Sequence, residues 1–112
     1  MSSILPGSEA FNTVVYGTVF GRRIDVVHRL APGDRLILVP DPPDIDPPTV
    51  WVHTLGGDVV GHLSPDVNSW LAPSMLAGTC YGGEVWLVRG DYAASWKRLV
   101  ISVRRVRSAK SA

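Results

Sequence analysis

Five of the nine residues in the stretch PDPPDIDPP (residues 40–48) are prolines, and three more are aspartates. Proline has no amide hydrogen to donate to a sheet, and the residue before each proline favours an extended backbone. The stretch therefore predicts a stiff, extended loop, followed at once by a strand that begins near Val50. The loop interrupts a chain that is otherwise rich in apolar segments, so it limits the fold to short elements on either side.

These apolar segments are short, and glycine, proline or aspartate bounds most of them. Such runs, continuous or alternating with period two, are typical of β-strands. The Gly56-Gly57 pair between two of them predicts a hairpin turn, and Gly17 predicts a bulge or a point of close approach. The expected strands are 13–21, 34–40, 49–55, 58–63, 83–90 and 97–106.

One helix is expected over residues 65–78. Ser64 can cap its first turn, Pro65 suits the first helical position, and Gly78 ends it. Pro73 lies inside this segment and removes one backbone hydrogen bond. About six strands and one short helix predict a mostly β fold, either a small β-barrel or a strongly curved sheet, with the helix covering one open side.

The length of 112 residues fits one domain. We expect an N-terminal extension (1–12), a barrel domain (13–106) and a basic tail (107–112). No apolar run approaches the roughly 20 residues of a membrane span, and the first residues do not resemble a secretion signal. The single cysteine, Cys80, cannot form an internal disulfide. A reducing, cytoplasmic location is therefore expected.

The charges are unevenly distributed along a nearly neutral chain. Residues 1–56 contain four arginines and six acids, whereas residues 57–112 contain seven basic residues and four acids. Residues 97–110 contain six basic residues and no acid. This stretch can be a surface that faces phosphate, or a solvated edge strand and tail that charge protects from aggregation. The second interpretation is favoured on this feature alone.

The aspartates of the proline-rich loop do not fit a metal site. A calcium loop needs glycine at its sharp turn and a closing glutamate, but here prolines flank Asp41, Asp44 and Asp46 and no glutamate follows. Zinc would need three or four ligands. His53 and His62, on strands that we expect to pair, could supply two and Cys80 a third. Half-exposed strand histidines are the better interpretation, so no metal and no cofactor are expected.

The sequence also contains no recognisable catalytic motif. There is no G-x-S-x-G turn and no phosphate loop, and Cys80 has no neighbouring histidine. We therefore do not expect an enzyme. Aromatic residues are more informative, because rings beside arginines form platforms for single-stranded nucleic acid. The aromatic residues considered are Tyr16, Phe20, Trp51, Trp70, Tyr81, Trp86, Tyr92 and Trp96. We expect most of them to lie in the core, with two or three available to a ligand.

Three blocks, in this order, resemble the HIRAN domain, a small β-barrel module. They are LAPGDRLILVPDPPDIDPPTVWV (30–52), GGDVVGHLSPDV (56–67), and the predicted helix followed by GEVWLV (83–88). The segment VVYGTVFGRR (14–23) is similar to the N-terminal strand of the family. The resemblance covers residues 13–104. It departs from the family pattern at Asp44, where the family has asparagine, and at Ile45, where it has an aromatic residue.

The resemblance implies a non-catalytic module with an OB-like barrel that binds the 3′ end of single-stranded DNA. Phe20 and Tyr16 would stack on bases, and Arg22 or Arg23 would meet a phosphate. The loop carboxylate, Asp46, would accept a hydrogen bond from the terminal hydroxyl and repel a further phosphate.

His62 would line the same pocket. Equally, Asp46 could do no more than order its own loop by bonding nearby amides. A second hypothesis is a protein–protein interaction or assembly module, in which the loop and the aromatic side chains contact a protein partner and nucleic acid plays no role.

Overall fold

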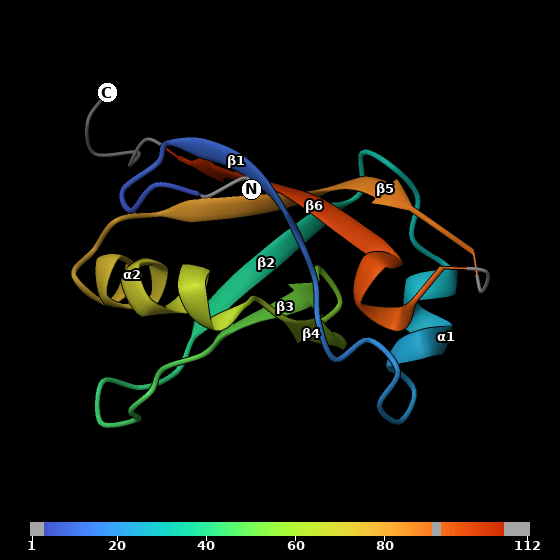
Figure 1. The fold of residues 1–112 in the computed structure, drawn as a ribbon, viewed down its shortest axis with the longest axis horizontal. Helices are drawn as coiled ribbons and strands as arrows, with labels where there is room; N and C mark the ends of the chain where they lie inside the picture. Colours follow the sequence, from blue (N-terminus) through green and yellow to red (C-terminus); the bar gives the residue numbers. More distant parts are fainter. Residues whose placement is uncertain (1–3, 91–92, 107–112) are drawn as a thin grey trace.

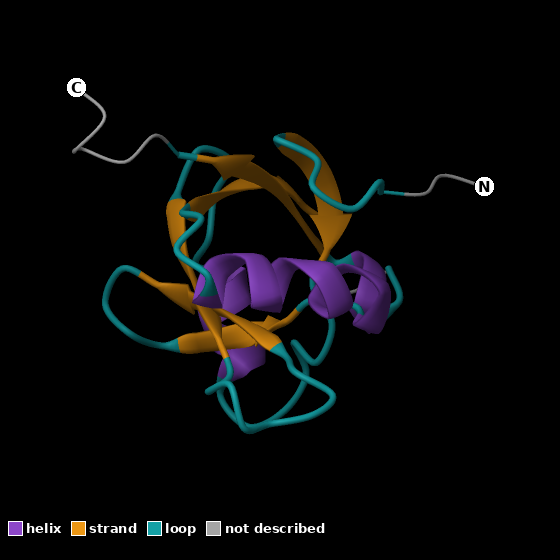
Figure 2. Cartoon of the chain, turned by 90° about the vertical axis from the view of Figure 1, so that its left-hand side faces the viewer, coloured by secondary structure: helices purple, strands orange, loops and turns teal. Residues whose placement is uncertain are grey.

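The computed structural model describes residues 4–90 and 93–106, and its fold is mostly β, as predicted. The strands form one antiparallel sheet in the order β1-β6-β5-β2-β3-β4. The sheet curls strongly into a half-barrel, which Figures 1 and 2 show from two sides. Its strands are β1 (Ala10–Val14), β2 (Arg35–Pro40), β3 (Val50–Thr54), β4 (Val59–His62), β5 (Tyr81–Val88) and β6 (Leu99–Arg105). The expected tail, 107–112, lies outside the described residues.

The predicted helix is present as α2 (Pro65–Leu76), but the expectation of a single helix was wrong. A second short helix, α1 (Arg23–His28), follows the first strand, and a 3₁₀ turn, η1 (Ser95–Lys97), precedes β6. Six residues are too few to display a helical period, and Arg22 at the N-cap makes no capping side-chain bond. The sequence around α1 therefore carries no helix signal.

The first strand lies earlier than predicted, so the expectation of a strand over 13–21 was wrong. β1 ends at Val14, and Tyr16 forms an isolated bridge to His62. Gly17 then has a φ of 72°, a left-handed conformation that ends extended structure. Ala10 to Asn12 pair with β6, so the sheet includes residues expected in the N-terminal extension.

The chain after β1 crosses from one edge of the sheet toward the other. The Val15 amide donates to the carbonyl of Leu99 on β6 (2.9 Å). The Tyr16 amide then donates to the carbonyl of His62 on β4 (2.8 Å), and the His62 amide donates back to the Tyr16 carbonyl (2.9 Å). Since β1 and β4 are the two edge strands, this crossing ties the open sides of the half-barrel together at one end.

The predicted hairpin between β3 and β4 is confirmed. The Gly57 amide donates to the Thr54 carbonyl (3.0 Å), and Gly57 has a φ of 93°. The two strands pair antiparallel with Trp51 opposite His62, and the register shifts between Val52 and His53. The turn and the pairing together bring Trp51 and His62 onto neighbouring strands.

The inside of the half-barrel holds the core, which is almost entirely aliphatic. One buried polar side chain joins the helix to the sheet. The Asn68 Oδ1 atom of α2 accepts a hydrogen bond from the Val50 amide (3.1 Å), and its Nδ2 donates to the Leu63 carbonyl (2.9 Å). Because buried polar groups need partners, this pair of bonds fixes α2 against β3 and the end of β4.

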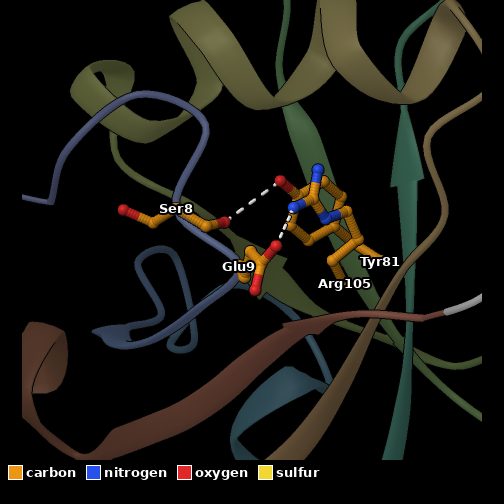
Figure 3. Close-up of polar contacts among 4 residues, drawn as sticks. All are labelled: Ser8, Glu9, Tyr81 and Arg105. Carbon is orange, nitrogen blue, oxygen red and sulfur yellow. Dashed lines mark hydrogen bonds and ion pairs between the residues drawn. The ribbon is translucent and has the colours of Figure 1, made fainter.

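The segment before β1 is attached to strands β5 and β6. The Tyr81 hydroxyl donates to the carbonyl of Ser8 (3.1 Å), and Arg105 forms an ion pair with Glu9, as Figure 3 shows. The Arg105 amide also donates to the Glu9 carbonyl (2.7 Å). Exposed ion pairs contribute little to stability, so the backbone and tyrosine bonds define this attachment.

Candidate functional site

Four rings and one guanidinium form a continuous row across the end of the half-barrel. The Tyr16 ring stacks on His62 (centroids 6.3 Å apart), and Trp51 meets His62 edge to face (5.7 Å). The Arg23 guanidinium lies 5.7 Å from the Trp51 centroid and 5.6 Å from that of Phe20. We call these five residues the aromatic row. It contains four of the six site residues that the sequence predicted: Tyr16, Phe20, Arg23 and His62.

The pairing of β3 with β4 and the start of α1 determine the positions of these side chains. Val50 and Val52 are buried, so Trp51 points to the opposite, outer face of β3. His62 lies opposite Trp51 on β4 and contacts Tyr16 through the bridge described above. Arg23 is the first residue of α1 and donates from Nη1 to the Gly17 carbonyl (3.0 Å). The turn between β1 and α1 thus brings the first strand, the hairpin and the helix together.

Gly17 makes this close packing possible. A Cβ atom at this position would lie 2.9 Å from His62 Nε2 and 3.3 Å from Arg23 Nη1, closer than ordinary contact. Its positive φ also favours glycine. The predicted close approach is confirmed, but Gly17 is a turn residue and not a bulge.

Arg22 and Arg23, which the sequence treats as equivalent, differ in their surroundings. Arg23 is half-buried and lies between two rings, with one hydrogen bond to the backbone. Arg22 is exposed, and its side chain forms no ion pair or hydrogen bond within the described part of the chain. Arg23 therefore holds the aromatic row together, whereas Arg22 is the cation available to a ligand.

A pocket of about 330 Å³ opens at the Phe20 end of the row. Phe20 is 62% exposed. Arg22 and the exposed carboxylate Asp58 lie on the same pocket. The pocket thus combines a largely exposed ring with two arginines and one carboxylate.

Asp46, the predicted partner of a terminal hydroxyl, does not line this pocket. Its side chain is exposed, and it has no hydrogen bond to any residue in 4–90 or 93–106. In Figure 1 the loop that connects β2 and β3 projects at the lower left, whereas α1 lies at the lower right. The tip of the acidic loop therefore projects away from α1.

A different aspartate of the loop contacts the aromatic row. Asp41 accepts a hydrogen bond on Oδ1 from the Trp51 indole Nε1 (2.9 Å) and one on Oδ2 from the Thr49 amide (2.9 Å). Sequence reasoning missed Asp41, Trp51 and Asp58 as site residues. The available signal was that four prolines separate Asp41 from Thr49, since a carboxylate commonly closes a loop on nearby amides.

The basic residues of 97–106 do not form one surface, and Arg107 and Lys110 lie outside the described residues. Lys97 and Arg98 precede β6, and Arg104 and Arg105 are at its far end, roughly 20 Å away at the rise of an extended strand. Lys97 Nζ lies over the Trp96 ring (4.6 Å), and Arg105 pairs with Glu9. The strand between them divides these cations into two separate groups.

The histidines and acids of the described residues form no group of three potential metal ligands. His53 lies opposite Val59 on the hairpin, while His62 lies opposite Trp51, so the two histidines are not cross-strand partners. The His62 Nδ1 atom is 3.1 Å from the Leu63 carbonyl. Nδ1 therefore carries the hydrogen in this contact, and Nε2 faces Gly17.

Comparison with known proteins returned no match: no family model fits the sequence, and neither the curated proteins nor the solved structures include one that matches. None of the helices in the described residues is long and apolar enough to cross a membrane. The candidate site is therefore defined by the geometry of the aromatic row and its pocket.

Proposed function

We propose that this chain is a non-catalytic module with an OB-like, HIRAN-like barrel that binds single-stranded DNA at a 3′ end. The observation that carries the proposal is the exposed Phe20 ring beside Arg22 at the end of the aromatic row. Bases of any sequence stack on such rings, and a neighbouring cation meets the phosphate backbone. Small curled barrels commonly offer one strand face and adjoining loops to oligonucleotides.

In this proposal the single-stranded DNA runs along the aromatic row. Phe20 stacks on a base, Arg22 meets a phosphate, and Tyr16 and His62 line the path. Trp51 lies where the row reaches the acidic loop, because Asp41 begins that loop and binds the Trp51 indole. The carboxylates Asp44 and Asp46 repel a further phosphate there. The loop thus favours a DNA strand whose 3′ end lies at this point over a DNA strand that continues past it.

The test is a binding titration with oligonucleotides of one sequence. Single strands with a free 3′ hydroxyl are compared with 3′-phosphorylated strands and with the duplex. We expect the highest affinity for the strand with a 3′ hydroxyl, a lower affinity for the 3′-phosphorylated strand and the lowest for the duplex. Each affinity should fall as the salt concentration is raised. A protein that ignores single strands at low salt does not have this function.

Replacing Arg22 by alanine is expected to flatten the salt dependence without changing base preference. One lost phosphate contact removes about 0.7 from the slope of log affinity against log salt for a single strand. Replacing Arg23 by alanine should weaken binding further, because it also frees Phe20 and Trp51. Titrations at several salt concentrations measure both slopes. Equal behaviour of the two variants would contradict the separate roles of the arginines.

Replacing Asp46 by alanine is expected to weaken binding of the 3′-hydroxyl end and to leave the 3′-phosphorylated end unchanged or slightly tighter. General electrostatics predicts instead that the loss of any acid tightens every DNA. Asp44→Ala is the matched control, because it removes the same charge from the same loop. If Asp46→Ala tightens both ends equally, the carboxylate does not read the hydroxyl. If Asp58→Ala produces the contrast instead, the 3′ end lies at the Phe20 pocket.

A second candidate function, a protein-interaction module, is favoured by the outer face of the sheet. A groove of about 620 Å³ lies there between β2, β5 and β6. Three large apolar residues around it are mostly exposed: Leu55 (66%), Trp86 (58%) and Val106 (50%). Exposed apolar patches mark interaction surfaces. Under this alternative Trp86, and not Phe20, is the residue whose loss abolishes function.

A further inference from the structure

Asp41 has a geometry that the other acids of the proline-rich loop lack. It is half-buried, and each of its carboxylate oxygens accepts one hydrogen bond, from the Trp51 indole and from the Thr49 amide. The Asp41 amide also donates to the Thr49 carbonyl (2.8 Å). Asp41 therefore closes the base of the loop and holds a ring of the binding site with the same side chain.

The Trp51 ring is the central element of the aromatic row. His62 approaches its ring with an interplanar angle of 76°, and Arg23 lies over its face. A rotation of the indole would displace both neighbours. Phe20 contacts the rest of the row through Arg23. Hydrogen bonds to a charged acceptor are stronger than neutral ones, so the Asp41 carboxylate is well suited to fix the ring.

We propose that Asp41 is a positioning residue that orients Trp51, and through it Arg23 and His62, for single-stranded DNA. The inference rests on the proposed function and deepens it, since it explains how the proline-rich loop contributes to the site. The prolines keep Asp41 and Thr49 at a fixed separation, and the carboxylate transmits that geometry to the ring. Asp41 does not touch the DNA itself.

The experiment compares Asp41→Ala, Asp41→Asn and the control Asp44→Ala. Asp44 is exposed and, within the described residues, forms no hydrogen bond with its side chain. Asp41→Ala is expected to weaken binding of a 3′-hydroxyl oligonucleotide about tenfold. Asp41→Asn should cost less, about threefold, because an amide oxygen can accept one of the two bonds but its nitrogen cannot accept the other. Asp44→Ala should bind equally or more tightly.

The second readout is independent of DNA. The Trp51 indole N–H resonance, assigned by its loss in Trp51→Phe, should shift in both Asp41 variants and stay in place in Asp44→Ala. In the Trp51→Phe background, Asp41→Ala should weaken DNA binding by less than about twofold, because the indole donor is already absent. If Asp41→Ala does not fold, as circular dichroism will show, Asp41→Asn supplies both readouts.

Three results would overturn the inference. They are an unchanged indole resonance in the Asp41 variants, tighter DNA binding by Asp41→Ala, and an equal effect of Asp41→Ala with and without the indole. A wild-type protein that binds no single-stranded DNA would instead overturn the proposed function. The indole resonance distinguishes the two failures, because it reports on the contact between Asp41 and Trp51 whether or not DNA binds.

Discussion

Replacing Gly61 by alanine is expected to lower the free energy of unfolding by about 3 kcal/mol, the upper end for an overpacked site. A Cβ atom at Gly61 would overlap the Tyr16 carbonyl oxygen and lie 2.7 Å from Val15 Cγ1. The Tyr16 carbonyl accepts the His62 amide, and Val15 is fully buried. Neither atom can move without breaking the crossing that joins the two edges of the half-barrel.

Gly56→Ala is the matched control for Gly61→Ala. Gly56 lies in the turn of the β3–β4 hairpin, and its φ is not in the left-handed region. An added Cβ atom would meet only Thr54 Oγ1, at 3.7 Å. This variant should be neutral or slightly stabilising, because alanine lowers the entropy of the unfolded chain. Urea denaturation of both variants measures the difference. Equal stabilities would contradict the close packing of β4 against the Tyr16 backbone.

Much of the sheet was predictable from local patterns. The strands around Gly56-Gly57 were expected because a glycine pair between two apolar segments specifies a hairpin. The helix after Ser64 was expected from Pro65 at its start, and the structure places its N-terminus there. In both cases residues adjacent in sequence determine the element, so no tertiary information was needed.

The errors concern the segment from Ala10 to His28, where tertiary contacts decide the structure. The run from Thr13 to Gly21 has the composition of one strand, but the chain must leave β6 to reach His62. A long-range backbone bridge of this kind leaves no local pattern. The following helix is stabilised by burial of Val26 and Val27 in the core, although its sequence carries no helix signal.

The candidate site was predictable by residue type but not by arrangement. The sequence singled out Tyr16, Phe20 and His62, and the structure brings them into one row. It could not separate Arg22 from Arg23, because only the turn at Gly17 places one guanidinium between two rings. Nor could it select the acid at the row, since loop closure and not composition decides which carboxylate meets an indole.

Replacing Phe20 by alanine is expected to weaken binding of single-stranded DNA by about 1–3 kcal/mol, or roughly 5- to 150-fold, if the ring stacks on a base. The ring is largely exposed, so its removal should leave the free energy of unfolding nearly unchanged. That separation is informative, because a loss of affinity without a loss of stability identifies a contact with the ligand.

Trp86→Ala is the control for Phe20→Ala, because Trp86 is exposed to a similar extent but lies on the outer face of β5. Fluorescence anisotropy with a labelled single strand, at one fixed salt concentration, measures both variants. The proposed function requires Phe20→Ala to lose affinity and Trp86→Ala to keep it. If both variants bind as the wild type does, no base stacks on Phe20. If Trp86→Ala alone weakens binding, the DNA lies in the groove between β2, β5 and β6, and the aromatic row belongs to the packing of the half-barrel and not to its ligand.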